Sequence, residues 1–188
     1  MGNRQVFGVA LIMLIALIKP ATADAQSSYI TREGNVSFFS TAPLEDIKAD
    51  NSRVQAVLDN TTGEIAVRMR IEDFQFAKSL MQKHFNENYM ESATYPEARL
   101  IGSVEGFDKI REGGANADVR VKGSLTIRGV TREVDIPGTI TRQGPHLICN
   151  AVFDVKLEDH NVRIPRLLVR NIAEVVEVTV NLRLAPID

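Results

Sequence analysis

The chain has 188 residues, of which 44% are hydrophobic and 24% are charged, and its formal net charge is −2. Without a basic excess the protein is not expected to bind nucleic acid. The absence of a polybasic cluster also argues against attachment to an anionic membrane surface. After the first 25 residues, the remaining length suits one domain with a sizeable hydrophobic core.

The first 25 residues differ from the rest of the chain. Arg4 precedes an apolar run over 6–18, and Ala23-Asp24-Ala25 supplies the small residues of a cleavage site. The run is too short for a comfortable membrane span, so these features predict a secretory signal peptide (1–25) cleaved after Ala25. A retained N-terminal anchor is the alternative. We expect 26–188 to form the mature domain, periplasmic or secreted, which does not span the membrane.

Cys149 is the only cysteine, so no internal disulfide can form. No thiol near the cleavage site could carry the lipid of a bacterial lipoprotein. Cys149 lies in an apolar, strand-like run over 147–153. This context favours a small buried hydrophobic residue over a reactive thiol.

The first part of the mature domain alternates apolar and polar residues, which is the period of a β-strand. Within it, 34–35 (Gly-Asn) predicts a turn, and 60–63 (Asn-Thr-Thr-Gly) predicts the turn of a hairpin. Residues 42–49 break the alternation and predict a loop or one helical turn. The expected strands are 29–32, 36–41, 52–59 and 64–72.

The period changes over 76–90, where apolar residues recur at spacings of four and five. This pattern predicts an amphipathic helix, which must end before Pro96. It is the only convincing helix of the mature domain. A strand over 97–107 follows, and then a loop over 108–116, whose Gly-Gly pair lacks the flanking pattern of a phosphate-binding loop.

The strongest strand signal covers 119–140. Two alternating runs, interrupted at Gly129, predict a long β-hairpin with its turn near 129–131. After it the sequence predicts, in order, a turn at 143–146, a strand over 147–157, a loop over 158–166, an ambiguous segment over 167–173 and a last strand over 176–184.

About eight long strands joined mainly by turns predict an antiparallel meander. A flat sheet would leave its apolar face wet and its edges open, and closure into a barrel removes both problems. We therefore expect an all-β protein, an eight-stranded antiparallel barrel with the helix packed over its mouth. Two packed sheets are the alternative. A barrel of this size is either filled by side chains or holds one small ligand.

No constellation of residues predicts catalysis, a metal site or a cofactor. His84, His146 and His160 fall on the helix, a turn and a loop, far apart in sequence. Asp159 and His160 are adjacent on an extended segment, so their side chains point apart, and a solvated loop is the expectation. We expect no enzyme. The arginines that alternate with inward residues should be solvated on the outer face: Arg68, Arg70, Arg120 and Arg128.

The remaining feature is a set of apolar residues predicted to face one interior volume. The pattern leaves open whether that volume is a filled core or a cavity. Gly102, Gly106 and Gly123 fall at inward positions, which favours space. His84 either packs against the backbone or donates to a ligand. The candidate ligand-binding residues are Phe38, Val67, Met69, Leu80, Met81, His84, Phe85, Leu100, Leu125, Ile127, Phe153, Val178 and Val180.

Three motifs resemble the YceI-like family: 80–85 (Leu-Met-Gln-Lys-His-Phe), 95–100 (Tyr-Pro-Glu-Ala-Arg-Leu) and 121–134 (Val-Lys-Gly-Ser-Leu-Thr-Ile-Arg-Gly-Val-Thr-Arg-Glu-Val). The resemblance extends over nearly the whole mature chain. It implies a lipocalin-like barrel of a secreted or periplasmic bacterial protein. It also implies a hydrophobic tunnel that holds a polyisoprenoid, an isoprenoid quinone or a similar amphiphile.

On this interpretation the partner is a long-chain isoprenoid or another lipid, and a homodimer is left open. The main alternative is a non-catalytic structural or protein-interaction barrel with a filled core. An enzyme that acts on a lipid through His84 is a third and weaker hypothesis.

Overall fold

The computed structural model describes residues 28–41, 46–163 and 173–187. The predicted signal peptide, residues 164–166 of the predicted loop and residues 167–172 of the ambiguous segment lie outside these residues. The strands are β1 (Ser28–Ser40), β2 (Ile47–Asp59), β3 (Glu64–Arg70), β4 (Gln75–Phe76), β5 (Glu97–Glu105), β6 (Asn116–Ile127), β7 (Val130–Gln143), β8 (His146–Lys156) and β9 (Val175–Ile187). The helical elements are η1 (Ile71–Asp73), α1 (Ser79–His84), η2 (Phe85–Tyr89), α2 (Asp108–Arg111) and η3 (Leu157–His160).

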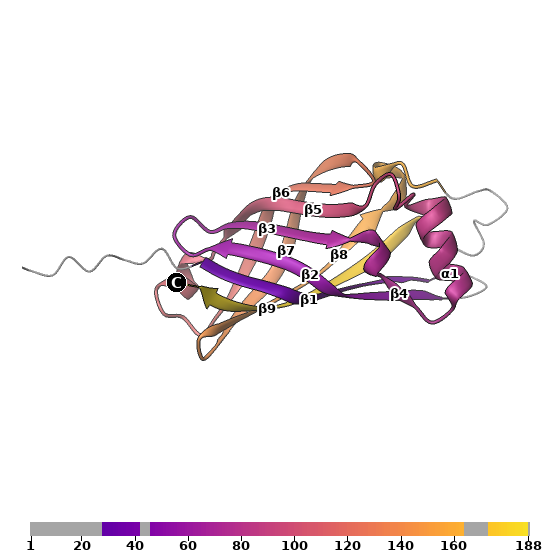
Figure 1. The fold of residues 1–188 in the computed structure, drawn as a ribbon. Coiled ribbons are helices and arrows are strands. Elements are labelled where there is room, and N and C mark those ends of the chain that lie inside the picture. Colours follow the sequence, from indigo (N-terminus) through magenta and orange to yellow (C-terminus); the bar gives the residue numbers. More distant parts are fainter. Residues whose placement is uncertain (1–27, 42–45, 164–172, 188) are drawn as a thin grey trace, which may run out of the picture.

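The strands form one antiparallel sheet that closes on itself. The order is β1-β9-β8-β7-β6-β5-β3-β2-β4, and β1 also pairs with β2. This confirms the predicted barrel of eight long strands, to which the two-residue β4 adds a short edge. Figure 1 shows α1 across one end of the barrel, with the C-terminus at the other. Closure directs all inward side chains into one interior, so the two-sheet alternative is wrong.

β1 is one continuous strand, and the turn predicted at 34–35 is wrong. The register of β1 against β2 shifts on both sides of Gly34, which marks a bulge. A Cβ added at Gly34 would lie 2.5 Å from Cδ2 of Leu182 in β9. A Cβ here would require the end of the Leu182 side chain to move, so glycine favours close packing inside the sheet, a role that sequence alone does not distinguish from a turn.

The hairpin turn predicted at 60–63 is confirmed, and the one predicted near 129–131 is present one residue earlier, at 128–129. At the β2–β3 turn, Asp59 Oδ1 accepts hydrogen bonds from the N–H groups of Thr61 and Thr62, each 2.8 Å long. The β6–β7 turn consists of Arg128 and Gly129, with φ of 48° and 72°. Two consecutive positive φ values are typical of the tight turn that matches the twist of a hairpin.

Several boundaries differ from the prediction. β2 already begins at Ile47, so the segment predicted as loop over 42–49 ends in strand. β3 stops at Arg70, where η1 turns the chain, and Phe76 pairs with Ala49 of β2. The helix consequently begins only at Ser79 and continues into a π-helical turn. The loop predicted over 108–116 contains α2.

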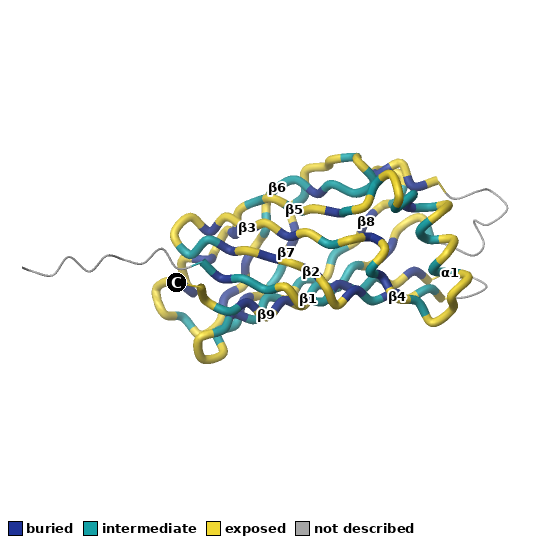
Figure 2. The backbone as a smooth tube through the Cα atoms, viewed as in Figure 1, coloured by how far each residue is buried: buried dark blue, intermediate teal, exposed yellow. Residues whose placement is uncertain are grey.

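The end of the barrel opposite α1 is filled. Phe107 precedes α2 and Ile110 lies within it. Both are buried in one hydrophobic cluster with Leu58, Leu147 and Leu184 of the strands. Figure 2 shows buried residues alternating with exposed ones along the strands, as expected for a barrel wall with one wet face. Any ligand cavity must therefore lie towards α1.

The wall is incomplete between β7 and β8 near the α1 end. Their ladder joins 138–143 to 146–151 and ends at the Gly138–Ala151 pair. Pro137, the next residue of β7, has no N–H to donate. Beyond it η3 packs against β7, and the Nδ1 of His160 lies 3.0 Å from the carbonyl oxygen of Val130. This one side-chain hydrogen bond joins β7 to η3 where the backbone ladder between β7 and β8 is absent.

Candidate functional site

The α1 half of the barrel contains a cavity of about 730 Å³. Its wall contains residues of all the strands except β7, and α1, η2 and η3 lie at its mouth. Most lining side chains are aliphatic or aromatic. The volume lies within the range of small-molecule sites, roughly 300–1,000 Å³.

The structure brings together most of the predicted ligand-binding residues. Ten of the thirteen line the cavity: Phe38, Met69, Leu80, Met81, His84, Phe85, Leu125, Ile127, Phe153 and Val178. Val67 belongs instead to the filled core, and Leu100 and Val180 pack against that core. Period-two alternation predicts that a side chain faces inward but not its depth along the barrel. Ligand binding by any of them stays a prediction.

A cluster of four phenylalanines positions the helical segment over the interior. Phe85, on η2, lies with its ring centroid 5.6 Å from Phe38, 5.6 Å from Phe74 and 5.0 Å from Phe76. Such tilted and offset pairs are the favoured arrangements of aromatic rings. The cluster therefore fastens η2, and with it α1, to β1 and β4.

The side chains of α1 face both the cavity and solvent. Leu80 lines the cavity although it is 62% exposed, so it lies where the mouth meets water. His84 is also exposed at the mouth and makes no hydrogen bond to another described residue. Of the two alternatives for His84, the bond to a backbone carbonyl is therefore not made to any described residue.

His160 was predicted to lie in a solvated loop, and this is wrong. His160 is only 3% exposed, and it lines the cavity from η3. In this 3₁₀ turn Leu157 and His160, three residues apart, face the same side. The Leu-x-x-His spacing directly after an alternating strand is the signal that could have indicated this. His160 is the functional candidate that sequence reasoning missed.

Arg128 was predicted to be solvated, and this too is wrong. Its side chain is only 17% exposed and pairs with Glu91. Nη1 donates to the carbonyl oxygen of Asn161 over 2.6 Å, and the guanidinium lies 5.5 Å from the centroid of the Tyr95 ring. Positive φ at the hairpin tip takes Arg128 out of the alternation, and its side chain fastens the rim of the barrel. The other three arginines are exposed, as predicted: Arg68, Arg70 and Arg120.

The inward glycines do not provide space for a ligand. Gly102 and Gly123 pair across β5 and β6, and neither lines the cavity. A Cβ added at Gly123 would lie 2.1 Å from the carbonyl oxygen of Ile101. These two glycines therefore permit a close approach of backbones. Gly106, with φ of 86°, serves the turn after β5.

The described residues contain no group of three His, Cys, Asp or Glu side chains that could hold a metal ion. Burial raises the pKa of the Cys149 thiol from 9.0 to about 12. A thiol with such a pKa is protonated and unreactive at neutral pH. Among the helices described here, none is long and apolar enough to cross a bilayer.

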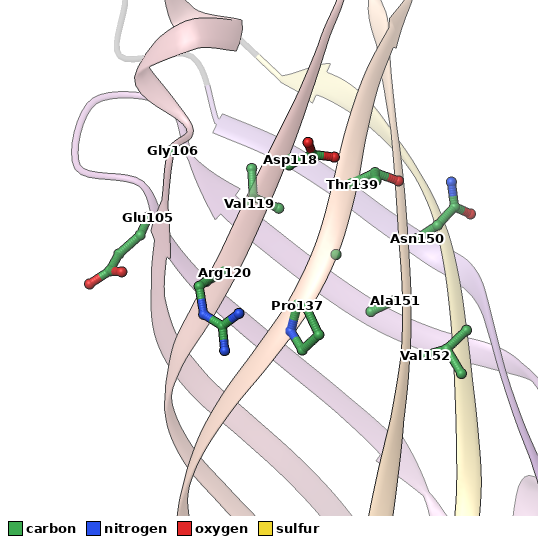
Figure 3. Close-up of a pocket in the computed structure, with 11 residues that line it drawn as sticks. Glu105, Gly106, Asp118, Val119, Arg120, Pro137, Thr139, Asn150, Ala151 and Val152 are labelled. Carbon is green, nitrogen blue, oxygen red and sulfur yellow. The ribbon is translucent and has the colours of Figure 1, made fainter.

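A second depression, of about 740 Å³, lies on the outer wall where β7 and β8 begin to separate (Figure 3). Its charged groups have partners: Arg120 bonds Asp135 at 2.7 Å, and Glu105 pairs with Lys122 at 3.0 Å. The side chains of Arg120, Glu105 and Val152 are exposed. The depression therefore lacks the desolvated walls of a small-molecule site.

Comparison with known proteins agrees with this architecture. A protein-family model described as YceI-like domain matches residues 22–184. A polyisoprenoid binding domain from Saccharophagus degradans is similar in structure, with a TM-score of 0.72 and 17% identity over 85% of this chain and 98% of that one. BcnA of Burkholderia cenocepacia has a TM-score of 0.67 and 18% identity, covering 81% and 96%.

The YCEI protein of Campylobacter jejuni has a TM-score of 0.56 and 10% identity, covering 99% of this chain and 94% of that one. No match was found among curated proteins. The likeness to solved structures, at these identities, supports the fold, and the family model covers most of the chain. The chain belongs to the YceI-like domain family.

Proposed function

We propose that the protein binds a polyisoprenoid, an isoprenoid quinone or a similar amphiphile in the cavity beneath α1. The observation that carries this proposal is the apolar cavity of about 730 Å³ inside a barrel whose opposite end is filled. The structurally similar domain from Saccharophagus degradans is described as polyisoprenoid binding, which supports the same ligand class here.

The volume limits the ligand. If each non-hydrogen atom of the ligand takes about 30 Å³, as a water molecule does in the liquid, a cavity of about 730 Å³ holds roughly 24 atoms. That corresponds to about four isoprene units with a small head group. A longer prenyl chain would extend past α1 into water or a second binding surface.

The distribution of polar groups sets the orientation of the ligand. Val36, Met69 and Phe153 offer only apolar surface to the cavity. The polar lining residues Lys78 and His84 lie at the start and at the end of α1, which is at the mouth. We propose that the chain enters first, because each buried methylene contributes about 0.8 kcal/mol before the cost of ordering the ligand.

A binding role fits the cavity better than catalysis. No described lining side chain is a carboxylate. The Ser40 oxygen accepts a hydrogen bond from the N–H of Ala173 and is not paired with a histidine. A filled interaction barrel, the other alternative, is disfavoured because the interior contains a cavity at the α1 end.

We also propose that the domain acts outside the cytoplasm, in the periplasm or as a secreted protein, after cleavage behind Ala25. The support is the charged, apolar and small-residue order of 1–25. Intact-mass measurement of the protein recovered from the periplasm and the medium of the expressing bacterium would test this. A product that begins at Met1 would contradict it.

Organic extraction of the purified protein followed by mass spectrometry tests the binding function. We expect a co-purifying isoprenoid or comparable amphiphile. A C20 isoprenoid alcohol added at about 100 times its Kd should stabilise the fold by about 2.7 kcal/mol. If no lipid co-purifies and neither alcohol nor quinone raises the melting temperature, the proposed function is wrong.

A further inference from the structure

We propose that Nε2 of His160 accepts a hydrogen bond from a hydroxyl group of the bound amphiphile. The protein would then select alcohols and quinols over ethers and quinones that carry the same chain. This inference rests on the proposed function, since it concerns a ligand in the same cavity. It assigns a role to a residue of η3 that neither the family motifs nor the helix α1 contains.

The first step is the protonation of the ring nitrogens. His160 Nδ1 lies 3.0 Å from the backbone oxygen of Val130. A carbonyl oxygen can only accept, so Nδ1 must carry the proton and donate it. In the neutral ring, Nε2 is then an unprotonated acceptor, and its tautomer is fixed by the bond to β7.

The second step is that Nε2 makes no hydrogen bond to a described residue. His160 is 97% buried by residue and lines the cavity. No other described residue is hydrogen-bonded to its ring. Nε2 is not among the fully buried polar atoms that lack a partner, which is consistent with its facing the open space of the cavity. A ligand that displaces water from this space must offer Nε2 a hydrogen bond or leave it unsatisfied, which is unfavourable.

The third step is the chemistry around the ring. The cluster that contains Leu157, Val162 and Ile127 is apolar except for Tyr89, whose hydroxyl makes no hydrogen bond to the His160 ring. A hydrogen bond is stronger in such a low-dielectric environment than in water. The bond to Val130 accounts for Nδ1 of the histidine and leaves Nε2 available to the cavity. A ligand hydroxyl supplies the missing donor, whereas an ether oxygen or a quinone carbonyl cannot.

The test compares a C20 isoprenoid alcohol with its methyl ether. The two ligands share the chain and the oxygen, but only the alcohol can donate. Their Kd values are measured on the full mature domain by competition with a fluorescent fatty-acid probe. One neutral hydrogen bond should make the alcohol bind about 2- to 12-fold more tightly than the ether.

His160→Leu should reduce this ratio to about one, while Leu157→Ala on the same turn should weaken both ligands and leave the ratio unchanged. The ratio is taken within one protein, so a general loss of stability does not move it. As a measurement that needs no variant, the ¹⁵N resonance of His160 Nε2 in the wild-type protein should shift with the alcohol and not with the ether.

Equal affinity for alcohol and ether in the wild-type domain would overturn the inference and leave the proposed function intact. The same holds if His160→Leu keeps the preference. If neither ligand binds, the proposed function itself fails, and the inference fails with it.

Discussion

Filling the cavity from inside should shorten the longest ligand that the protein accepts. Val178, in β9, lines the cavity, whereas Val152, in β8, is 52% exposed on the outer wall. Val178→Trp adds about seven non-hydrogen atoms, or roughly 210 Å³ at about 30 Å³ each. Of the cavity of about 730 Å³, roughly 520 Å³ would remain, enough for about 17 ligand atoms instead of about 24.

Two isoprenoid alcohols fall on either side of the new limit. A C15 alcohol has about 16 non-hydrogen atoms and should still fit, whereas a C20 alcohol has about 21 and should leave about four outside. At about 0.8 kcal/mol per buried carbon the loss for the C20 alcohol is about 3 kcal/mol at most. Because the excluded carbons also stay more mobile, we expect a loss of about tenfold to a hundredfold in affinity.

The assay is a chain-length series from C10 to C25, with each Kd measured by competition in the wild-type domain, Val178→Trp and Val152→Trp. The outer substitution adds the same atoms to the solvent side of the wall and should leave the whole series unchanged. The reasoning is refuted if Val178→Trp binds the C20 alcohol as tightly as the wild type does. It is equally refuted if Val152→Trp loses as much as Val178→Trp.

Three further predictions concern the barrel itself. Arg128→Ala should lower the free energy of unfolding in urea by about 2 kcal/mol, because it removes a half-buried ion pair and a backbone hydrogen bond. Arg120→Ala, at an exposed pair, should cost less than about 1 kcal/mol. Similar losses for the two variants would contradict the role of Arg128 in fastening the rim of the barrel. Gly123→Ala should lower the free energy of unfolding by about 3 kcal/mol or prevent folding, since its Cβ would lie 2.1 Å from the carbonyl oxygen of Ile101. A free energy of unfolding within about 0.5 kcal/mol of the wild type would refute this. With its pKa at about 12, Cys149 should react with a thiol reagent at pH 8 about a thousandfold more slowly in the folded than in the unfolded protein. The reaction rate of the folded protein should rise about tenfold per pH unit, because the thiolate fraction rises in the same way. A pH-independent rate would contradict this.

Much of the barrel could be predicted from alternation because each strand has one buried and one wet face. The hairpin of β6 and β7 and the last strand follow directly from this period. Period two reports only the direction of a side chain, however. It cannot separate a bulge from a turn at Gly34, nor indicate that β7 and β8 separate beyond Pro137, because both depend on the neighbouring strands.

The candidate site could also be predicted only in part, because alternation gives the direction of a side chain but not its depth along the barrel. Phe38, Met69 and Val178 were expected to face inward and line the cavity, whereas Val67 faces inward in the filled half. The hollow and filled halves differ in what packs from the far side of the barrel, which is a long-range property. His160 and Arg128 were misjudged because each lies just beyond a strand end, where the alternation no longer applies.

The pairing of β1 with β9 determines when the barrel can close. β1 contains the first described residues of the chain and hydrogen-bonds to a strand that begins at Val175. Without β9, β1 has only β2 beside it, and β8 has only β7. Until β9 has paired with both, the sheet therefore stays open and its apolar face is accessible to chaperones.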